Sequence, residues 1–368
     1  MPKQKGDDNI RLNKSNRGNA KEKKRTLGSR LLNTMIMLLV IALGIATVVK
    51  TDIISLLTER FSAKTESFSM MSDIKGICSS ADEFSANIVK SRDPVYVVDL
   101  DDYAAPKPDP GKFDENFEKY DDETISVHYY KERKYNSWFH FMEVRIKHPS
   151  QIRLALAYNR FASSKKNRKL PSEISADVNA VCAVNSGFYN TRWSGVLIHR
   201  RELLKNRPVG LDVLLIDANG NFHIVADREI ESSGVLEEYD IINAVTFGPQ
   251  LVKDGEALTI TKRNWQPDTE EPRTAICQFE DGLHYLICLV EGRNRVSVGV
   301  SMQTFAREIA AKNVRIAYNL DGGQSGTMII GNHLKNRVGW GPEKPQSDII
   351  FFATAVEAQS GIDDQISE

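Results

Sequence analysis

Four turn dipeptides limit the architectures open to this chain. Asn-Gly, Asp-Gly and related pairs adopt the positive φ angles that a two-residue β-hairpin loop requires. Because the two strands of a hairpin are antiparallel, these pairs predict sheets built largely from antiparallel strands. Each pair lies between two short apolar runs; the four are Asn219-Gly220, Asp254-Gly255, Asp281-Gly282 and Gly331-Asn332.

Helical patterns are few beyond residue 121. The clearest begins at Ser301, which can cap a helix whose apolar residues recur on one face. We therefore predict an α+β fold for residues 122–356, a mixed, largely antiparallel β-sheet domain with a few covering helices. Residues 357–368 are predicted to form a polar C-terminal tail. The apolar stripe of the predicted helix consists of Met302, Phe305, Ala306, Ile309 and Ala310.

Residues 31–49 are nineteen residues without a charge, bracketed by Arg30 and Lys50. As a helix rising about 1.5 Å per residue, this segment spans roughly the hydrocarbon core of a bilayer. No small-residue cleavage site follows it, which favours an uncleaved signal anchor over a removed signal peptide. The sequence thus predicts one N-terminal transmembrane helix before the β-rich domain.

Residues 1–30 contain ten Lys or Arg and three acidic residues, with almost nothing apolar. This composition predicts a disordered tail, and the positive-inside rule places it in the cytoplasm. The protein should then cross the cell membrane once, with its β-rich domain extracellular. Since the anchor accounts for the basic tail, we expect no nucleic-acid partner. Residues 50–121 are interpreted as a stalk and linker, which either packs on the domain or mediates self-association.

The cysteines are too few and too widely spaced for a zinc site or a disulfide framework. Cys277 and Cys288 flank the Asp281-Gly282 turn, so a cross-strand bridge and two buried free thiols are both open, and we favour the thiols. The sequence also lacks an H-E-x-x-H pair, a G-x-S-x-G elbow, a Walker loop and a G-x-G-x-x-G loop after a strand. These absences exclude the commonest hydrolase and nucleotide-binding classes.

An acidic, glycine-rich segment at residues 319–328 follows a strand-like apolar run. Asp321 would lie where that strand ends, and Gly322 and Gly323 would let backbone amides approach a ligand. With the hydroxyls of Ser325 and Thr327, this segment suits an anionic or polyhydroxylated substrate. An Asp-Gly turn between two strands is the alternative interpretation.

Two arginines are predicted to lie at one rim of a sheet. Arg273 opens the hairpin around Asp281-Gly282 and Arg293 follows its second strand, so both emerge on the same side. Two guanidinium groups suit a phosphodiester or a carboxylate, which arginine binds with a planar fork. Another polar motif, with Asn185 and Gly187, also follows a strand-like run.

The polar motifs together resemble the phosphodiester glycosidase family in residues and in order. The resemblance covers roughly residues 122–352, and bacterial members are often described as exopolysaccharide biosynthesis proteins. The chain departs from the family pattern at Ser186, Tyr189, Gln324 and Gly326. The six motifs are Asn185-Ser-Gly-Phe-Tyr, Phe247-Gly-Pro-Gln-Leu-Val-Lys-Asp-Gly, Pro272-Arg-Thr-Ala, Glu291-Gly-Arg, Ser297-Val-Gly and Asn319-Leu-Asp-Gly-Gly-Gln-Ser-Gly-Thr-Met.

This resemblance implies a hydrolase that cleaves a glycosyl phosphodiester in cell-envelope or exopolysaccharide metabolism. Asp321 would be the nucleophile or base and Glu291 the second carboxylate. The resemblance implies no particular cofactor, and a divalent cation on Asp321 is an alternative. A non-catalytic glycan-binding or assembly scaffold is the competing function, and Gln324 favours it. The residues expected to bind the glycosyl-phosphate or polysaccharide substrate are Asn185, Gly187, Arg273, Arg293, Gly322, Gly323, Ser325 and Thr327.

Overall fold

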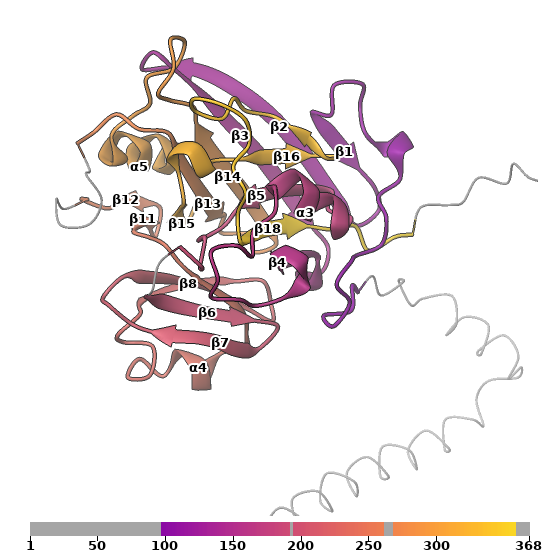
Figure 1. Cartoon of the computed structure of the whole chain (residues 1–368), viewed down its shortest axis with the longest axis vertical. Coiled ribbons are helices and arrows are strands. Elements are labelled where there is room, and N and C mark those ends of the chain that lie inside the picture. Colours follow the sequence, from indigo (N-terminus) through magenta and orange to yellow (C-terminus); the bar gives the residue numbers. More distant parts are fainter. Residues whose placement is uncertain (1–96, 192–193, 261–267, 358–368) are drawn as a thin grey trace, which may run out of the picture. The chain divides into compact units, whose positions relative to one another are not determined.

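The computed structural model describes residues 97–191, 194–260 and 268–357 (Figure 1). The predicted basic tail, the predicted membrane anchor and most of the predicted stalk lie outside these residues, as does nearly all of the predicted C-terminal tail. Within the described part, no helix is long and apolar enough to cross a membrane.

The largest sheet has eight strands, and its three middle strands β13, β14 and β15 are buried along their whole length. A strand covered on both faces is apolar almost throughout instead of alternating, which explains the sequence of β14. The order across the sheet is β1 (Lys119–Asp121), β2 (Ile125–Lys134), β3 (Ser137–Ile146), β14 (His284–Val290), β13 (Arg273–Gln278), β15 (Ile316–Leu320), β11 (Gln250–Lys253) and β12 (Glu256–Ala257).

Two five-stranded sheets complete the β structure of the described residues. One has the order β17 (His333–Leu334), β16 (Met328–Ile330), β5 (Cys182–Asn185), β18 (Asp348–Phe352) and β4 (Ile152–Leu156). The other has the order β7 (Glu202–Arg207), β6 (Gly195–His199), β10 (Ile241–Thr246), β8 (Asp212–Asp217) and β9 (Phe222–Ala226).

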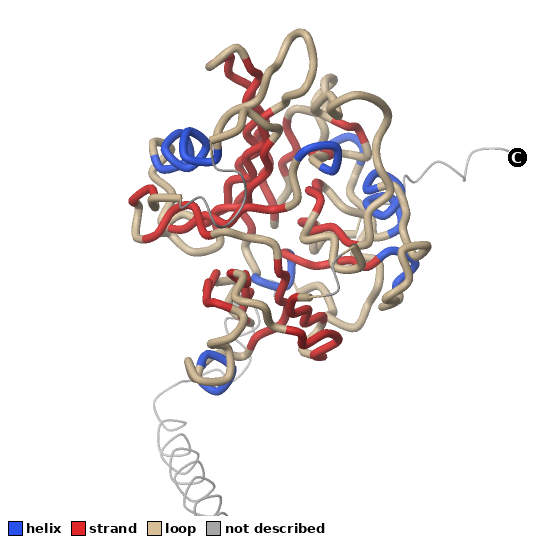
Figure 2. The backbone as a smooth tube through the Cα atoms, turned by 60° about the vertical axis from the view of Figure 1, so that its left-hand side comes forward, coloured by secondary structure: helices blue, strands red, loops and turns tan. Residues whose placement is uncertain are grey.

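Little of the described chain is helical, as Figure 2 shows. The helix predicted after Ser301 is α5 (Met302–Ala310), and the Ser301 hydroxyl accepts a hydrogen bond from the Thr304 amide at 3.1 Å. The predicted α+β class, with a few helices on antiparallel sheets, is therefore confirmed. The other helices of the described residues are α3 (Pro171–Asp177) and α4 (Val235–Glu238), with 3₁₀ turns η1 (Pro110–Lys112), η2 (Pro149–Gln151), η3 (Ala157–Asn159) and η5 (Gly323–Ser325).

All four predicted hairpins form. Asn219-Gly220 joins β8 to β9, Asp254-Gly255 joins β11 to β12, Asp281-Gly282 joins β13 to β14, and Gly331-Asn332 joins β16 to β17. Both residues of the second and fourth pairs have positive φ, as a type I′ turn requires. Every pairing between the described strands is antiparallel.

The main core draws apolar side chains from all three sheets, for example Tyr318 of β15, Ile350 of β18 and Leu214 of β8. A second cluster packs the other face of the eight-stranded sheet against α5, where Phe305 is fully buried. A third cluster lies between the sheet of β5 and β18 and helix α3. Burial on both faces of the middle strands fixes their ends, and the candidate site is built on those ends.

Residues upstream of 122, where we placed the start of the glycosidase-like domain, already pack on it. Val98 and Ala105 are buried in the third cluster, and the Ala105 amide donates to the Val178 carbonyl at 3.1 Å. The Arg153 guanidinium binds the carbonyls of Asp99 and Leu100 at 2.8 and 3.3 Å. The Pro-rich composition before residue 112 therefore marks a loop that lies on the domain.

Cys277 and Cys288 are free and buried on neighbouring strands. Their partners across the ladder are Leu286 and Ala275, so the two thiols are diagonal neighbours. Burial, followed by the adjacent Cys288, raises the pKa of the Cys277 thiol well above its ordinary value. The favoured interpretation of two buried thiols is confirmed.

His199 makes folding sensitive to pH. Its Nε2 lies 3.1 Å from the Leu154 carbonyl, and burial, together with the neighbouring Arg200, lowers the pKa of the imidazole to about 4. The unfolded chain takes up this proton first, near pH 6.5, so stability should fall as the pH drops from about 6.5 to 4, by up to about 3 kcal/mol. Denaturant unfolding of His199→Gln, which keeps an N–H donor but does not titrate, should show a correspondingly flatter pH dependence. Equal slopes for the variant and the wild type would contradict this assignment.

Candidate active site

The buried strand β15 ends at Leu320, and Asp321 follows it directly. The next strand, β16, belongs to a different sheet, so the Asp-Gly pair here does not form a hairpin turn. A Cβ on Gly322 would lie 2.6 Å from the Pro272 carbonyl oxygen, which only glycine avoids. The Gly323 amide donates to that same carbonyl at 3.1 Å. This close approach fixes the acidic loop against the start of β13.

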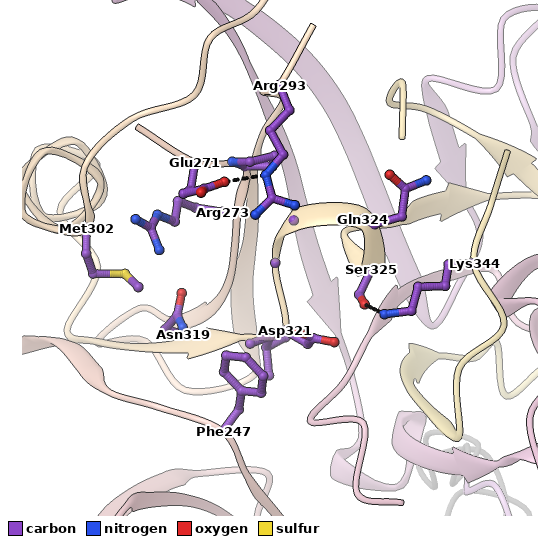
Figure 3. A pocket seen from close by; sticks show the side chains of 14 residues that line it. Phe247, Glu271, Arg273, Arg293, Met302, Asn319, Asp321, Gln324, Ser325 and Lys344 are labelled. Carbon is purple, nitrogen blue, oxygen red and sulfur yellow. Dashed lines mark hydrogen bonds and ion pairs between the residues drawn. The ribbon is translucent and has the colours of Figure 1, made fainter. Parts of the chain in front are cut away.

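The loop forms one wall of a cavity of about 360 Å³. Figure 3 shows Asp321 below this space, Arg293 above it, Arg273 on the left and Lys344 on the right. Six of the predicted site residues therefore meet here. The lining consists of Phe247, Glu271, Pro272, Arg273, Arg293, Met302, Asn319, Leu320, Asp321, Gly322, Gly323, Gln324, Ser325 and Lys344.

The two arginines reach the same rim because of the hairpin register. Arg273 pairs with Val290, and Arg293 lies three residues beyond Val290. The Arg273 side chain is buried, and it donates to the carbonyls of Val300 and Thr269 at 3.2 and 2.9 Å. Burial, opposed by Glu271 and reinforced by Arg293, lowers the pKa of Arg273 to about 10. A desolvated cation that stays protonated at neutral pH interacts strongly with an anion in the cavity.

Glu271 is a pocket residue that the sequence motifs did not indicate. Its carboxylate forms an ion pair with Nε of Arg293. The Glu271 backbone packs closely on Gly299, where a Cβ would lie 2.5 Å from the Glu271 carbonyl carbon. The only signal was that Glu271 directly precedes the Pro272-Arg-Thr-Ala motif.

Lys344 is a second pocket residue that we did not predict. Its Nζ donates to the Ser325 hydroxyl at 3.1 Å and lies 4.7 Å from the ring centroid of Phe188. Lys344 comes from the loop before β18, far along the chain from the acidic loop. No local pattern marked it, since its contact with Ser325 joins two residues that are 19 apart in the chain.

Asn185 and Thr327, which we expected to bind substrate, hold the acidic loop from behind. The Asn185 side-chain amide donates to the Asp321 carbonyl at 2.5 Å and accepts from the Thr327 amide at 3.0 Å. Both residues are buried and neither lines the cavity. They are positioning residues for Asp321.

Gly187 also lies outside the cavity lining, and its amide is occupied. It donates to the buried carboxylate of Asp348 at 3.2 Å, and a Cβ on Gly187 would lie 2.7 Å from the Thr246 carbonyl oxygen. Glycine is required here for packing between two motifs. We expected this amide to meet a substrate oxygen, and in the structure it donates to Asp348 instead.

Glu291, our predicted second carboxylate, is buried away from the cavity. It accepts hydrogen bonds from His140 Nε2 at 3.0 Å, from the Arg337 amide at 2.8 Å and from the Ser297 hydroxyl at 3.3 Å. Burial raises the pKa of the Glu291 carboxyl, but these bonds outweigh burial and the net shift is downward. Glu291 therefore fixes the Arg337 loop, and Glu271 is the second carboxylate that the cavity contains.

Glu291→Gln tests this correction. A glutamine keeps the size and one acceptor of the glutamate but weakens the bonds from His140 and Ser297, so stability should fall by about 1–3 kcal/mol. Turnover should change by less than about ten-fold, since the residue does not reach the cavity. Denaturant unfolding and steady-state rates would measure both effects. Loss of turnover by several orders of magnitude in a folded variant would restore Glu291 to the chemistry.

The cavity is cationic, and its donor set suits an anion better than a metal ion. Among the residues that the structure describes, no group of three or more His, Cys, Asp or Glu side chains is placed to hold a metal. Among the residues that line the cavity, only Asp321 and Glu271 are acidic, and Glu271 forms an ion pair with Arg293. A divalent cation on Asp321 would therefore depend on carbonyl oxygens and water for its other ligands.

The cavity brings a carboxylate at the end of a buried strand together with two guanidinium groups and an ammonium group, and this charge suits an anionic ligand. Residues 178–353 match the phosphodiester glycosidase family, and this range contains all six motifs. This match confirms the resemblance that the motifs indicated.

Similarity to individual proteins is more distant. The chain is 25% identical to the SPbeta prophage-derived uncharacterized protein YomE of Bacillus subtilis (strain 168) over 194 residues. This alignment covers 51% of this chain and 30% of that protein. The chain therefore spans less than a third of the length of that relative. The catalytic domain of zebrafish N-acetylglucosamine-1-phosphodiester alpha-N-acetylglucosaminidase, auto-inhibited by its pro-peptide, superposes with a TM-score of 0.51 and 17% identity, over 62% of this chain and 82% of that domain. This likeness shows a shared fold.

Proposed function

We propose that this chain is an enzyme that hydrolyses a glycosyl phosphodiester at the bond between the anomeric carbon and the phosphate oxygen. The observation that carries the proposal is the placement of Asp321 in one cavity with Arg273 and Arg293. The cations match a phosphodiester, and the carboxylate matches the positive charge that develops on an anomeric carbon. The family match and the shared fold support the same reaction.

The reaction assigns a task to each group in the cavity. Arg273, Arg293 and Lys344 bind the phosphate oxygens and stabilise the phosphate as it leaves with the electron pair of the C–O bond. Because a phosphate ester is already a good leaving group, little protonation of the departing oxygen is needed. Asp321 either attacks the anomeric carbon or removes a proton from the attacking water. The products are a free sugar and a phosphomonoester.

Gln324 does not block the cavity, which weakens the scaffold alternative. Its side-chain amide donates to the Pro342 carbonyl at 3.1 Å and accepts from the Trp340 amide at 3.0 Å. The extra side chain at this position therefore binds a neighbouring loop. The sequence argument for a protein that binds glycans without turnover rested on this residue.

Incubation of the purified full-length protein with alkyl phosphodiesters of N-acetylglucosamine 1-phosphate and of glucose 1-phosphate tests the proposal. Phosphorus and proton NMR should show the diester signal replaced by a phosphomonoester and a free sugar. Tight binding of the diesters without turnover would favour the scaffold function instead.

We further propose that the domain acts outside the cell on an envelope polysaccharide or its precursor. The support is the uncharged segment at residues 31–49, which directly follows the basic tail at residues 1–30. Protease added to intact, wall-stripped cells should then digest the domain, and an antibody against it should detect its loss. Survival of the domain until the cells are lysed would contradict this topology.

A further inference from the structure

Trp340 is the most exposed large apolar side chain among the described residues, at 73%. It lies at the rim of the candidate active site, because the guanidinium carbon of Arg293 is 5.1 Å from its ring centroid. Its amide donates to the side chain of Gln324, another cavity residue. An exposed indole is unfavourable for solubility and contributes little to folding, so its position at a cavity rim points to a ligand.

The backbone around Trp340 is held at several points. Before it, Asn336 binds the Met328 amide and the Gly326 carbonyl at 2.9 and 3.0 Å. After it, the Glu343 carboxylate accepts from the Ser172 amide and hydroxyl at 2.7 and 2.6 Å. The loop is thus fixed while the indole stays in solvent. Pre-organisation of this kind lowers the entropy cost of binding.

A second cavity, of about 480 Å³, is lined by this loop. Arg295 and Arg337 line it, and both are exposed. Neither guanidinium has an ion-pair partner within the described ranges, whereas Glu343 at the same cavity is engaged by Ser172. The linings of the two cavities include consecutive residues, because Arg293 lines the first cavity and Asn294 lines the second.

We infer that the two cavities and Trp340 form one cleft for a polymeric substrate whose sugars are joined through phosphodiesters. The inference rests on the proposed function and names its substrate class. One glycosyl phosphate occupies the cavity of Asp321, and the adjoining sugar stacks on the indole through its apolar C–H face. The next phosphate lies between Arg295 and Arg337. This arrangement accounts for an exposed indole and two unpaired cations beside a site that already has its own phosphate ligands.

Kinetics on substrates of different length test this cleft. The full-length protein would be given a synthetic trimer of N-acetylglucosamine joined by 1,6-phosphodiesters, and the matching monomeric methyl phosphodiester. Wild type should prefer the trimer by roughly ten-fold or more in kcat/KM. Trp340→Ala should lower kcat/KM for the trimer at least ten-fold more than for the monomer, and Trp340→Phe, which keeps an aromatic face, should recover most of the loss. Leu203→Ala, at another exposed apolar side chain on β7, is the control and should change neither value.

Equal rates on trimer and monomer in the wild type, or an unchanged preference in Trp340→Ala, would overturn the cleft. Calorimetric binding separates this failure from failure of the proposed function. If neither substrate is hydrolysed, the hydrolase proposal fails. The cleft would still predict that the protein binds the trimer. Trp340→Ala should then weaken this binding about ten-fold, and the double variant Arg295→Ala/Arg337→Ala should weaken it by a similar factor. A neutral chitotriose bound as tightly as the anionic trimer would overturn the role of the two arginines.

Discussion

Asp321→Asn should lower the single-turnover rate on a glycosyl phosphodiester by at least about 10³-fold. The substitution keeps the size of the side chain but removes the negative charge, and stabilisation of a charged transition state is worth several kcal/mol in a water-poor site. Two hydrogen bonds that hold the loop are made by backbone groups of Asp321, to Asn185 and Ser186, so these two remain. The melting temperature should therefore shift by only a few degrees. Rapid-mixing kinetics and thermal unfolding measure the two quantities.

Asp281→Asn is the matched control, because Asp281 is an exposed aspartate in the β13–β14 turn that is paired with Arg145. Its turnover should equal that of the wild type within about two-fold. An active Asp321→Asn enzyme, or equal losses in both variants, would remove Asp321 from the chemistry.

Arg273→Lys should lower kcat/KM by roughly 10²-fold, mainly through weaker phosphate binding. Lysine keeps the charge but not the planar fork, and it cannot reach Val300, Thr269 and a phosphate at once. The variant should also lose about 1–3 kcal/mol of stability, because the two carbonyls lose donors. Calorimetric titration with the phosphomonoester product would separate the affinity loss from the stability loss measured by unfolding.

Arg145→Lys, on the exposed face of β3, is the control for this substitution. Its affinity for the phosphomonoester should be unchanged. A wild-type affinity in Arg273→Lys would mean that Arg273 serves only to tie down the backbone carbonyls.

Local sequence chemistry predicted the features of this fold that depend on neighbours in the chain. The four turn dipeptides each require positive φ, and each forms a hairpin. Hairpin geometry alone placed Arg273 and Arg293 at one rim, and both line the cavity. The capped helix after Ser301 follows from spacing and one hydroxyl.

Features that depend on packing between distant segments were not predicted. The pairing of β13 with β15 brings Pro272 against Gly323, and this contact places Glu271 in the cavity. Lys344 reaches Ser325 from the loop between β17 and β18. Periodicity in the sequence predicts neither the contact of Pro272 with Gly323 nor that of Lys344 with Ser325.

The motifs identified residues more reliably than roles. Asn185 and Glu291 stand in the right motifs, but each is buried and binds the backbone of a loop. Glu291 directly follows the buried strand β14, as Asp321 directly follows the buried strand β15, so position in the sequence could not show which carboxylate faces the cavity. Their role is to fix the loops that carry Asp321 and Trp340.

The position of the cleaved bond is the most direct test of the account. The full-length protein would hydrolyse an alkyl N-acetylglucosaminyl phosphodiester in ¹⁸O-labelled water, and mass spectrometry would locate the label after a single enzyme-limited turnover, with correction for exchange at the free anomeric carbon. Attack at the anomeric carbon predicts label in the released sugar and none in the phosphomonoester. Label in the phosphomonoester would mean that water attacks phosphorus, and the assignment of Asp321 to the anomeric carbon would be wrong.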